Sequence, residues 1–414
     1  MGTHGQQNHT IIIPTFNRPE LLKNLVDYYS AQAPQYTLLV LDSSRAEIVK
    51  ENAGSLSHRQ NVLHKVYPPD VKVMDKLCAG LALVRTPFLS FCGDDDLVFP
   101  DGIDASLVFL AQHPDYICTH GLYFNFRVED SCVYLASEYS GPSIDAAHPG
   151  ARIFALCQKY ESLFYAVFRT TDAVRIFNDA ATISTVHFQE LFQSAAAALR
   201  GKIKRLPVLY GARRSGPPAE ADRVKWQTYG WFADDPAELI THYAIYRAAL
   251  WTHFQIIVPD QQFSEVDFTR TLDLAHAVYF AAGCSPDYFY AQLHHLWPDD
   301  KFRASGRLDA IHEASRMLIM KRALLPDGRQ LDIWDQLRGA GSGGLAGTGI
   351  FGGLRFLYLS LLGYLNIKQI NWSAPSRQAW QLHLPKMLLW LGGDRQFKIA
   401  YRQLSLYLSK PARM

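Results

Sequence analysis

The sequence lacks three features that would place it in common classes of protein. Its six cysteines include no C-x-x-C pair and no Cys/His cluster at zinc spacing, which argues against a structural zinc site and a disulfide framework. No uncharged apolar run approaches the roughly 20 residues that span a bilayer, and the polar first ten residues lack the apolar core of a signal peptide. A cytoplasmic protein with reduced cysteines is therefore expected.

The chain also lacks a strong excess of charge of either sign. Its 41 Lys and Arg nearly balance its 39 Asp and Glu, so the whole chain gives no indication of a nucleic-acid partner. The distribution is uneven, because residues 343–414 hold nine Lys and Arg and a single acid, Asp394. Residues 350–414 are also rich in aromatic side chains. Two interpretations stay open: peripheral contact with an anionic membrane through 350–414, or packing in a helical domain with the charges facing water.

What the sequence does contain is an alternation of strand and helix signals over residues 10–125. Short apolar runs that end in polar residues predict buried strands, and amphipathic segments between them predict helices. The expected strands are 10–13, 36–41 and 87–92. The expected helices are 19–30, 73–84 and 101–112. This order predicts an α/β fold with a mostly parallel sheet flanked by helices.

The pattern changes near residue 215, after a segment rich in Arg, Gly and Pro. Helical segments separated by Pro, Gly or Asp then follow, at 236–258, 266–282, 286–296 and 308–325. Residues 339–353 are rich in glycine, as in a flexible linker. We therefore expect an α/β domain over 1–215, a mainly α-helical domain over 216–338, and a Gly-rich linker with basic aromatic helices over 339–414.

Polar side chains follow three of the expected strands. Asn17 and Arg18 follow the first, Asp42 the second, and the acidic triplet 94–96 the third. In mostly parallel sheets, ligands lie beyond the carboxyl ends of the strands. Three consecutive carboxylates repel one another unless a cation or full solvation separates their charges. Mg²⁺ or Mn²⁺ held by one or two carboxylates and by substrate phosphates is one interpretation; a solvated acidic turn before a helix is the other.

Three blocks of the sequence resemble family 2 glycosyltransferases, which have the GT-A fold. They are Thr10-Ile-Ile-Ile-Pro-Thr-Phe-Asn-Arg-Pro-Glu-Leu-Leu22, Val40-Leu-Asp-Ser-Ser44 and Phe91-Cys-Gly-Asp-Asp-Asp-Leu-Val-Phe-Pro100, in the family's order within residues 9–215. The resemblance implies that the first two blocks bind the base and ribose of a nucleotide sugar, through Pro14, Thr15, Asn17, Arg18 and Asp42. It implies that the third block binds ribose, metal and diphosphate, through Asp94, Asp95 and Asp96. Of these, Asp96 or Asp95 would be the ligand of Mn²⁺ or Mg²⁺.

The acidic block departs from the family pattern at one position. The usual block reads Asp-x-Asp-Asp, and alignment on Pro100 puts Gly93 where the first Asp would stand. Either the motif has shifted by one residue, or another residue supplies one ribose contact.

Three further residues are candidates for the site. The resemblance implies a general base at the start of a late helix, which points to Glu190; the alternative is an ordinary first-turn Glu favoured by the helix dipole. Lys76, on the helix before the acidic strand, either reaches a phosphate or is solvated. Arg213, with its neighbour Arg214, either clamps a diphosphate or belongs to a basic linker.

Together these features predict an inverting, metal-dependent glycosyltransferase. It would move a sugar from a nucleotide-diphosphate donor, with UDP favoured from family frequency, to a hydroxyl of a glycan, a lipid-linked glycan or a glycoprotein. Two rivals remain. A sugar-phosphate nucleotidyltransferase would show a Gly-rich basic loop after the first strand, which residues 14–18 do not. A non-catalytic nucleotide-sugar-binding scaffold on a degenerate transferase fold stays open because of Gly93.

Overall fold

A computed structural model describes residues 8–129, 132–139, 141–214, 236–257 and 264–283, together with four short strands farther along the chain. The elements up to residue 214 are β1 (His9–Thr15), α1 (Pro19–Gln32), β2 (Thr37–Asp42), α2 (Ala46–Leu56), β3 (Val62–Val66), α3 (Val73–Leu81), β4 (Phe88–Phe91), β5 (Leu97–Val98), α4 (Pro100–Gln112), β6 (Tyr116–Glu129), β7 (Cys132–Tyr139), α5 (Pro149–Gln158), β8 (Val167–Arg169), α6 (Thr170–Ala180), α7 (Val186–Arg200) and β9 (Lys202–Arg214). Each helix and strand expected within residues 10–125 is present; α2, β3 and the two-residue β5 were not foreseen.

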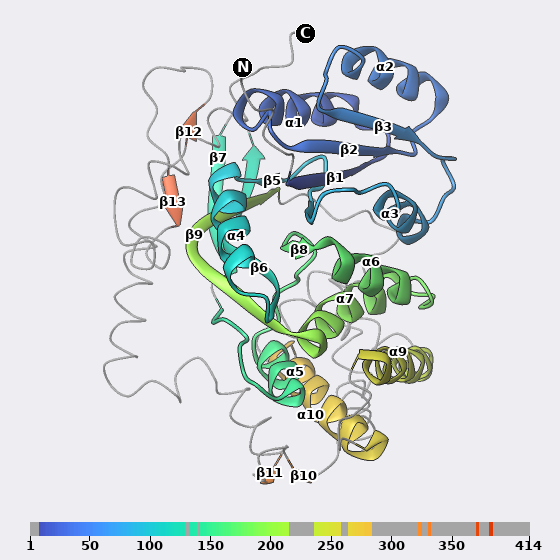
Figure 1. Ribbon diagram of the computed structural model, residues 1–414, viewed down its shortest axis with the longest axis vertical. Helices are drawn as coiled ribbons and strands as arrows, with labels where there is room; N and C mark the ends of the chain where they lie inside the picture. Colours follow the sequence, from blue (N-terminus) through green and yellow to red (C-terminus); the bar gives the residue numbers. More distant parts are fainter. Residues whose placement is uncertain are drawn as a thin grey trace, which may run out of the picture.

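The central sheet is mixed, with a parallel block of four strands at one end of the strand order (Figure 1). Strand β1 lies between β2 and β4 and runs parallel to both, and β3 extends the block beyond β2. Strand β8 lies antiparallel between β4 and β6, and β6 pairs with β9 in parallel. The chain leaves β1 for β2 on one side and later adds β4 on the other, so the strand order reverses at β1. The predicted α/β fold with a largely parallel sheet flanked by helices is confirmed.

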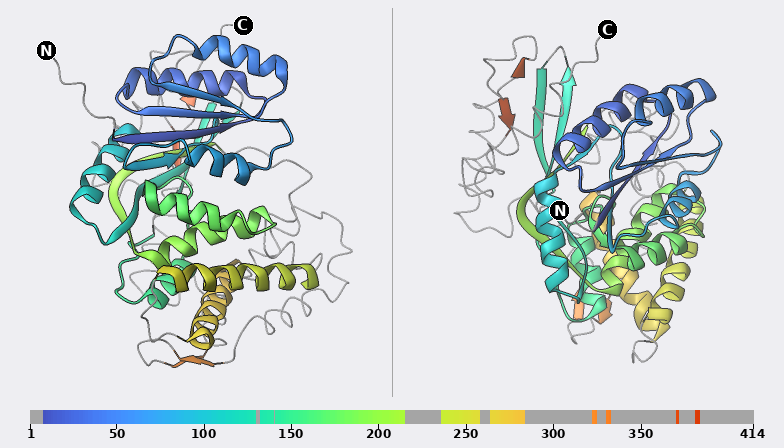
Figure 2. Two further views of the ribbon diagram at one scale, coloured as in Figure 1. Left: turned by 45° about the vertical axis from the view of Figure 1, so that its right-hand side comes forward. Right: turned by 45° about the horizontal axis from the view of Figure 1, so that its top comes forward.

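The run of three isoleucines in β1 explains why helices cover both faces of this sheet. Successive side chains of a strand point to opposite faces. Ile11 and Ile13 are packed in one core with side chains of α1 and α4, whereas Ile12 belongs to a second core with α3, α6 and α7. The helices lie above and below the strands in Figures 1 and 2. A strand with both faces buried is expected to read as a continuous apolar run.

The helices predicted after residue 236 are present as α9 (Pro236–Ile257) and α10 (Glu265–Gly283). They pack against α7 and α5, and Tyr246 and Phe254 of α9 are fully buried in the same core as α6 and α7 (Figure 2). These two helices therefore share a hydrophobic core with the α/β part. A separate helical domain over 216–338 stays a prediction.

Other expectations for the second half are wrong or fall outside the described residues. A helix was expected over 308–325, but residues Arg322–Leu324 form strand β10, which pairs with β11 (Gln330–Asp332). The expectation is therefore wrong for these three residues. Within 339–414, where basic aromatic helices were expected, the two described segments are strands, β12 (Ile370–Asn371) and β13 (Gln381–His383), which pair with β7. The helix at 286–296, the Gly-rich linker and the rest of 350–414 lie outside the described residues.

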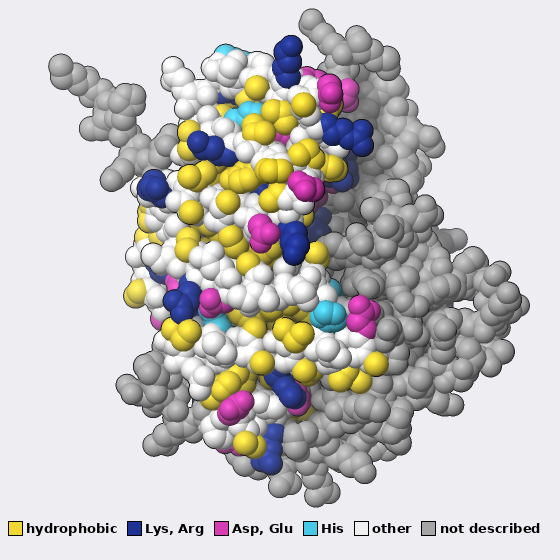
Figure 3. Space-filling view, turned by 90° about the vertical axis from the view of Figure 1, so that its right-hand side faces the viewer, with side chains coloured by type: hydrophobic (Ala, Val, Ile, Leu, Met, Phe, Trp, Pro, Cys, Tyr) yellow, Lys and Arg dark blue, Asp and Glu magenta, His cyan; other side chains and the backbone are white. Residues whose placement is uncertain are grey.

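On the face drawn in Figure 3, the described residues show no segregation by charge. Lys and Arg side chains lie there among Asp, Glu and hydrophobic side chains. Within the described part of the chain, no helix is both long and apolar enough to cross a membrane.

Candidate active site

The loops after β1 and β2 are joined to each other at the point where the strand order reverses. Asn17 has a left-handed backbone, with φ of 56°, which asparagine tolerates better than most residues and which turns the chain from β1 into α1. The backbone amide of Asn17 donates a 2.8 Å hydrogen bond to the Ser44 hydroxyl, and the side-chain oxygen of Asn17 accepts one from the backbone amide of Arg45 at 3.0 Å. Pro14 lies within β1, in register with Leu41 of β2. Both loops are thereby fixed at one edge of the sheet.

Asp42 is fully buried at the end of β2. One carboxylate oxygen accepts from the Ser44 amide, and the other accepts from Asn52 and pairs with His64 at 3.0 Å. Burial alone would raise the pKa of Asp42, but these hydrogen bonds hold it well below its usual value. The carboxylate therefore shapes the loop after β2, and its expected contact with a ribose stays a prediction.

Asp94 joins the end of β4 to the loop after β1. Its carboxylate accepts a 2.7 Å hydrogen bond from the Thr15 hydroxyl and a 3.0 Å bond from the Arg18 guanidinium, which also contacts Asp95 at 2.7 Å. The Arg18 side chain is half exposed, so the guanidinium that contacts these acids lies at the protein surface. Burial raises the pKa of Asp94, while Thr15 and Arg18 oppose the shift.

Asp96, like Asp94, is buried; each of the two residues exposes 6% or less of its surface. The Tyr165 hydroxyl donates to its Oδ2 at 2.5 Å, and the Arg214 backbone amide donates to its Oδ1 at 2.7 Å. The Arg213 guanidinium Nε lies 3.9 Å from Oδ2. Burial, and next the charge of Asp95, raise the pKa of Asp96 to about 6. The interpretation as a solvated acidic turn is therefore wrong for Asp94 and Asp96, whereas the Asp95 side chain is partly exposed.

The end of β9 reaches Asp96 because β9 pairs with β5, the two-residue strand that directly follows the triplet. Leu97 lies opposite Ala212 and Val98 opposite Gly211, so the next residues of β9, Arg213 and Arg214, lie beside the acids. The Arg213 guanidinium also stacks over the Tyr165 ring, 5.5 Å from its centroid. The structure thus places Arg213 at the acidic edge, as the diphosphate-clamp interpretation requires.

Gly93, the departure from the family pattern, lies against the Tyr165 hydroxyl. A Cβ atom at this position would come within 3.1 Å of that hydroxyl and 3.2 Å of the Asp95 carboxylate. Any side chain here would force these groups to move, and a fourth carboxylate would add charge to an already acidic edge. The Tyr165 hydroxyl therefore leaves little room for a side chain at position 93, and it donates a hydrogen bond to Asp96.

Lys76 lies beneath both loops. Only 3% of the residue is exposed, so the interpretation of a solvated helical lysine is wrong. Its ammonium donates to the Thr15 carbonyl at 3.1 Å and to the Ser43 hydroxyl at 2.7 Å. Burial lowers the pKa of Lys76, and the charges of Asp42 and Asp94 oppose the shift. These contacts make Lys76 a positioning residue for the loops; a contact with a phosphate stays a prediction.

Replacing Lys76 with Met is expected to lower the free energy of unfolding by about 2 kcal/mol, because two buried acceptors lose a charged donor. The loops after β1 and β2 then lose their common support, so we also expect weaker nucleotide binding. Urea denaturation and calorimetric titration with UDP and GDP measure the two effects. Lys72→Met, at an exposed position just before α3, is the matched control. Equal stability of the two variants would contradict this role.

A cavity of about 200 Å³ adjoins the acids through Tyr165 and Arg213, which both line it. Glu190 and Gln193 of α7 line it too. Helix α7 begins at Val186 and has no acid in its first turn, so the alternative of Glu190 as a dipole-stabilised first-turn residue is wrong. Glu190 instead lies in the second turn, facing a cavity next to the acidic edge.

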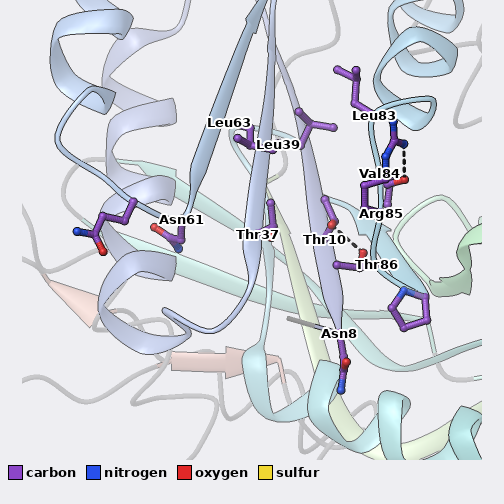
Figure 4. Close-up of a pocket in the computed structure, with 12 residues that line it drawn as sticks. Asn8, Thr10, Thr37, Leu39, Asn61, Leu63, Leu83, Val84, Arg85 and Thr86 are labelled. Carbon is purple, nitrogen blue, oxygen red and sulfur yellow. Dashed lines mark hydrogen bonds between the residues drawn. The ribbon is translucent and has the colours of Figure 1, made fainter. Parts of the chain in front are cut away.

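A larger cavity, of about 510 Å³, lies at the opposite edge of the sheet (Figure 4). It is lined by residues at the starts of the central strands, among them Thr10 of β1 and Thr37 of β2, and by Thr86, whose hydroxyl bonds that of Thr10. Ligands of such sheets lie at the carboxyl ends of the strands, and the acids lie there too. Size alone is therefore a poor guide to the active site of this protein.

Two residues of the site were missed from the sequence. Phe16, 49% exposed, lies in the loop after β1 between Thr15 and Asn17. An exposed aromatic residue between polar residues after a buried strand is a signal that the sequence does offer. Tyr165 offers no such signal, because nothing in a segment rich in Phe and Tyr marks one hydroxyl as the partner of Asp96.

The acidic edge suits a metal ion that shares its coordination with a substrate. Among the described residues, no group of three or more His, Cys, Asp or Glu side chains converges as a metal site. A metal held by protein side chains alone therefore does not fit. The carboxylates of Asp95 and Asp96 do offer the oxygen ligands that Mg²⁺ and Mn²⁺ take alongside phosphate oxygens. A cation there would offset both the burial and the charge of Asp95, which together raise the pKa of Asp96.

No protein-family model matches this sequence, and no curated protein matches it. Among solved structures, the chain is similar to residues 1–349 of TarS from S. aureus, with a TM-score of 0.46 and 12% identity over 82% of this chain and 92% of that one. The complex of the same fragment with UDP-GlcNAc gives a TM-score of 0.44 and 13% identity, with the same coverage. The mannosyltransferase PcManGT from Pyrobaculum calidifontis, in complex with GDP-Man and Mn²⁺, gives 0.38 and 13% over 75% of this chain and 86% of that one.

Proposed function

We propose that this protein is a metal-dependent, inverting glycosyltransferase that uses a nucleotide-diphosphate sugar. One observation carries the proposal: the buried carboxylates of Asp94 and Asp96 lie where the strand order reverses, next to a cavity lined by Glu190. Desolvated acids at this edge of an α/β sheet are costly for folding, and a cation with a diphosphate would offset that cost. The Glu190 carboxylate in the lining of that cavity would act on a second substrate.

The donor nucleotide would bind along the loops after β1 and β2. The exposed ring of Phe16 offers a face on which a base can stack, and Thr15, Asn17 and Arg18 line the same turn. Arg18 and Arg213 flank the acids and present guanidinium groups that match phosphate oxygens. UDP is the favoured nucleotide, on family frequency alone.

The divalent cation, Mn²⁺ or Mg²⁺, would be held by Asp96 and Asp95 together with oxygens of the diphosphate. When bound, it supplies positive charge that neutralises the diphosphate as that group leaves. The Tyr165 hydroxyl and the Arg214 amide fix the orientation of the Asp96 carboxylate by occupying one site on each of its oxygens. A carboxylate has about four acceptor sites, so both oxygens keep capacity for a cation.

Glu190 is the proposed general base. It would take the proton from an acceptor hydroxyl as that oxygen attacks the anomeric carbon of the donor sugar. The new bond joins the acceptor oxygen to the anomeric carbon, and the bond from that carbon to the diphosphate oxygen breaks. The nucleoside diphosphate leaves with the bonding electron pair, and the configuration at the anomeric carbon inverts. The acceptor would be a growing polysaccharide, a lipid-linked glycan or a glycoprotein.

Slow hydrolysis of the donor tests this proposal without knowledge of the acceptor. UDP-, GDP-, dTDP- and CMP-sugars are incubated with the protein in Mn²⁺, in Mg²⁺ and in EDTA, and the released nucleotide is measured. We expect one class of donor to be cleaved, only when the metal is present. If no donor binds or is cleaved with either metal, the acidic edge is not a transferase site.

A further inference from the structure

Arg18 is the residue through which the loop after β1 contacts two acids of the triplet at once. One nitrogen of its guanidinium, Nη1, donates to Asp94 Oδ1 at 3.0 Å and to Asp95 Oδ2 at 2.7 Å. Asp94 also accepts from the Thr15 hydroxyl, but within the described residues no side chain other than Arg18 hydrogen-bonds Asp95. The Asp95 carboxylate, a proposed ligand of the metal, is therefore already paired with a cation that the protein itself supplies.

The backbone of Arg18 is fixed, whereas its guanidinium keeps hydrogen-bonding capacity. Arg18 lies just before α1, and its carbonyl accepts from the Leu22 amide at 3.1 Å. The preceding residue, Asn17, is held by Ser44 and by the backbone amide of Arg45. The Arg18 side chain is half exposed, and within the described structure Nη1 alone of its guanidinium nitrogens makes hydrogen bonds. The other nitrogens can therefore donate to a ligand that arrives from solvent.

A positive charge at this position has opposite effects on a metal alone and on a metal with a diphosphate. A cation bound to Asp95 would lie within a few ångströms of the guanidinium, and like charges at such a distance repel each other. The guanidinium also takes up part of the acceptor capacity of the carboxylate. A diphosphate removes this conflict, because its oxygens accept hydrogen bonds from the guanidinium and coordinate the metal at the same time.

We propose that Arg18 is a resident counter-ion of the acidic edge, which opposes binding of the divalent metal until a nucleoside diphosphate is present. The proposal rests on the transferase function and adds the way in which its ligands assemble: the metal binds weakly alone, and metal and nucleotide bind tightly together. By linkage, the factor by which the nucleotide raises metal affinity equals the factor by which the metal raises nucleotide affinity. Arg18 increases this coupling factor and keeps the acids paired while the nucleotide is absent.

The test replaces Arg18 with Met, which keeps much of the length of the side chain and removes its charge. Electron paramagnetic resonance of free Mn²⁺ measures the affinity for Mn²⁺ with and without nucleotide. Calorimetric titration measures the affinity for UDP and GDP at saturating Mn²⁺. Arg270→Met, at an exposed position in α10, is the matched control.

In Arg18→Met, we expect the affinity for Mn²⁺ alone to rise about 5-fold, because two partly exposed ion pairs that oppose the metal are lost. The affinity for the nucleotide at saturating Mn²⁺ is expected to fall about 10-fold, because its phosphates lose a charged donor. A merely structural role of Arg18 would weaken both interactions, since a distorted loop binds neither ligand better. The double variant Arg18→Met/Asp95→Asn should lose the gain in Mn²⁺ affinity, which assigns that gain to this edge.

Three results would overturn the proposal. The first is an affinity of Arg18→Met for Mn²⁺ alone that is equal to or below that of wild type. The second is a gain that survives in the double variant, because the metal would then bind elsewhere. The third is a coupling factor between Mn²⁺ and nucleotide that is the same in Arg18→Met as in wild type.

Failure of the proposed function gives a different pattern. Wild type would then bind no Mn²⁺ in the presence of UDP, GDP or dTDP. If Arg18→Met nevertheless gains affinity for Mn²⁺ alone and loses it in the double variant, the counter-ion role stands and the transferase is rejected. If neither wild type nor Arg18→Met binds Mn²⁺ under any of these conditions, both are rejected.

Discussion

Asp96→Asn is expected to abolish metal-supported cleavage of the donor while it stabilises the protein in the absence of metal. The amide keeps the shape of the side chain but removes the charge that binds the cation. Stabilisation of a leaving group by a metal is worth several kcal/mol, so we expect the rate to fall about 10³-fold or more. The released nucleotide, measured at saturating Mn²⁺, gives this rate.

The gain in stability follows from the buried charge of Asp96. The pKa of Asp96 in the folded protein, about 6, lies above the usual aspartate value of 3.8 because the carboxylate is buried. The folded state therefore binds a proton more tightly than the unfolded state, and the stability of wild type falls as pH rises from 4 to 6. A shift of this size corresponds to about 3 kcal/mol. Asp96→Asn should equal wild type in stability near pH 4 and exceed it by up to this amount at pH 7.

Urea denaturation in EDTA at pH 4 and pH 7 measures the difference. Asp70→Asn, at an exposed loop position, is the control and should show no such dependence on pH. In wild type, the same titration predicts that Mn²⁺ binding weakens as pH falls through 6, because the carboxylate must lose its proton to bind. A variant that is less stable than wild type at pH 7 would show that the charge of Asp96 is already compensated in the apo protein.

Glu190→Gln is expected to lower the rate of sugar transfer by about 10²- to 10⁴-fold, the usual contribution of a general base. The affinity for the nucleoside diphosphate should not change, because Glu190 lines the adjoining cavity and is not among the residues proposed to hold the metal and the diphosphate. Rate and binding are measured separately, by turnover of the donor and by calorimetric titration.

Glu265→Gln, at an exposed position at the start of α10, is the matched control for this change. A structural role for Glu190 would lower the melting temperature and weaken nucleotide binding together with the rate. A variant that keeps its full rate would show that Glu190 is not the general base, without contradicting the proposed donor site.

The local sequence was sufficient to predict three of the parallel strands, β1, β2 and β4. The three isoleucines of β1 predicted a strand buried on both faces, and Pro19 at the first turn of α1 marked the start of a helix. The strand β3 was missed because its sequence, Val62-Leu-His-Lys-Val66, mixes polar and apolar residues at the sheet edge, where Leu63 and Val66 are half exposed. Packing at an edge is weak, so the sequence carries only a weak signal of it.

The sequence by itself also determined which acids to examine, because Asp94 to Asp96 follow a buried strand and carboxyl ends of parallel strands meet at one edge. Only the tertiary structure decided their chemistry. Tyr165 and Arg214 reach Asp96 from 69 and 118 residues away in the sequence. These contacts depend on the pairing of β9 with β5, which no local pattern encodes. Burial likewise decided that Lys76 supports the loops and that the pKa of Asp96 is raised, because desolvation is a property of the packed fold and not of the residue.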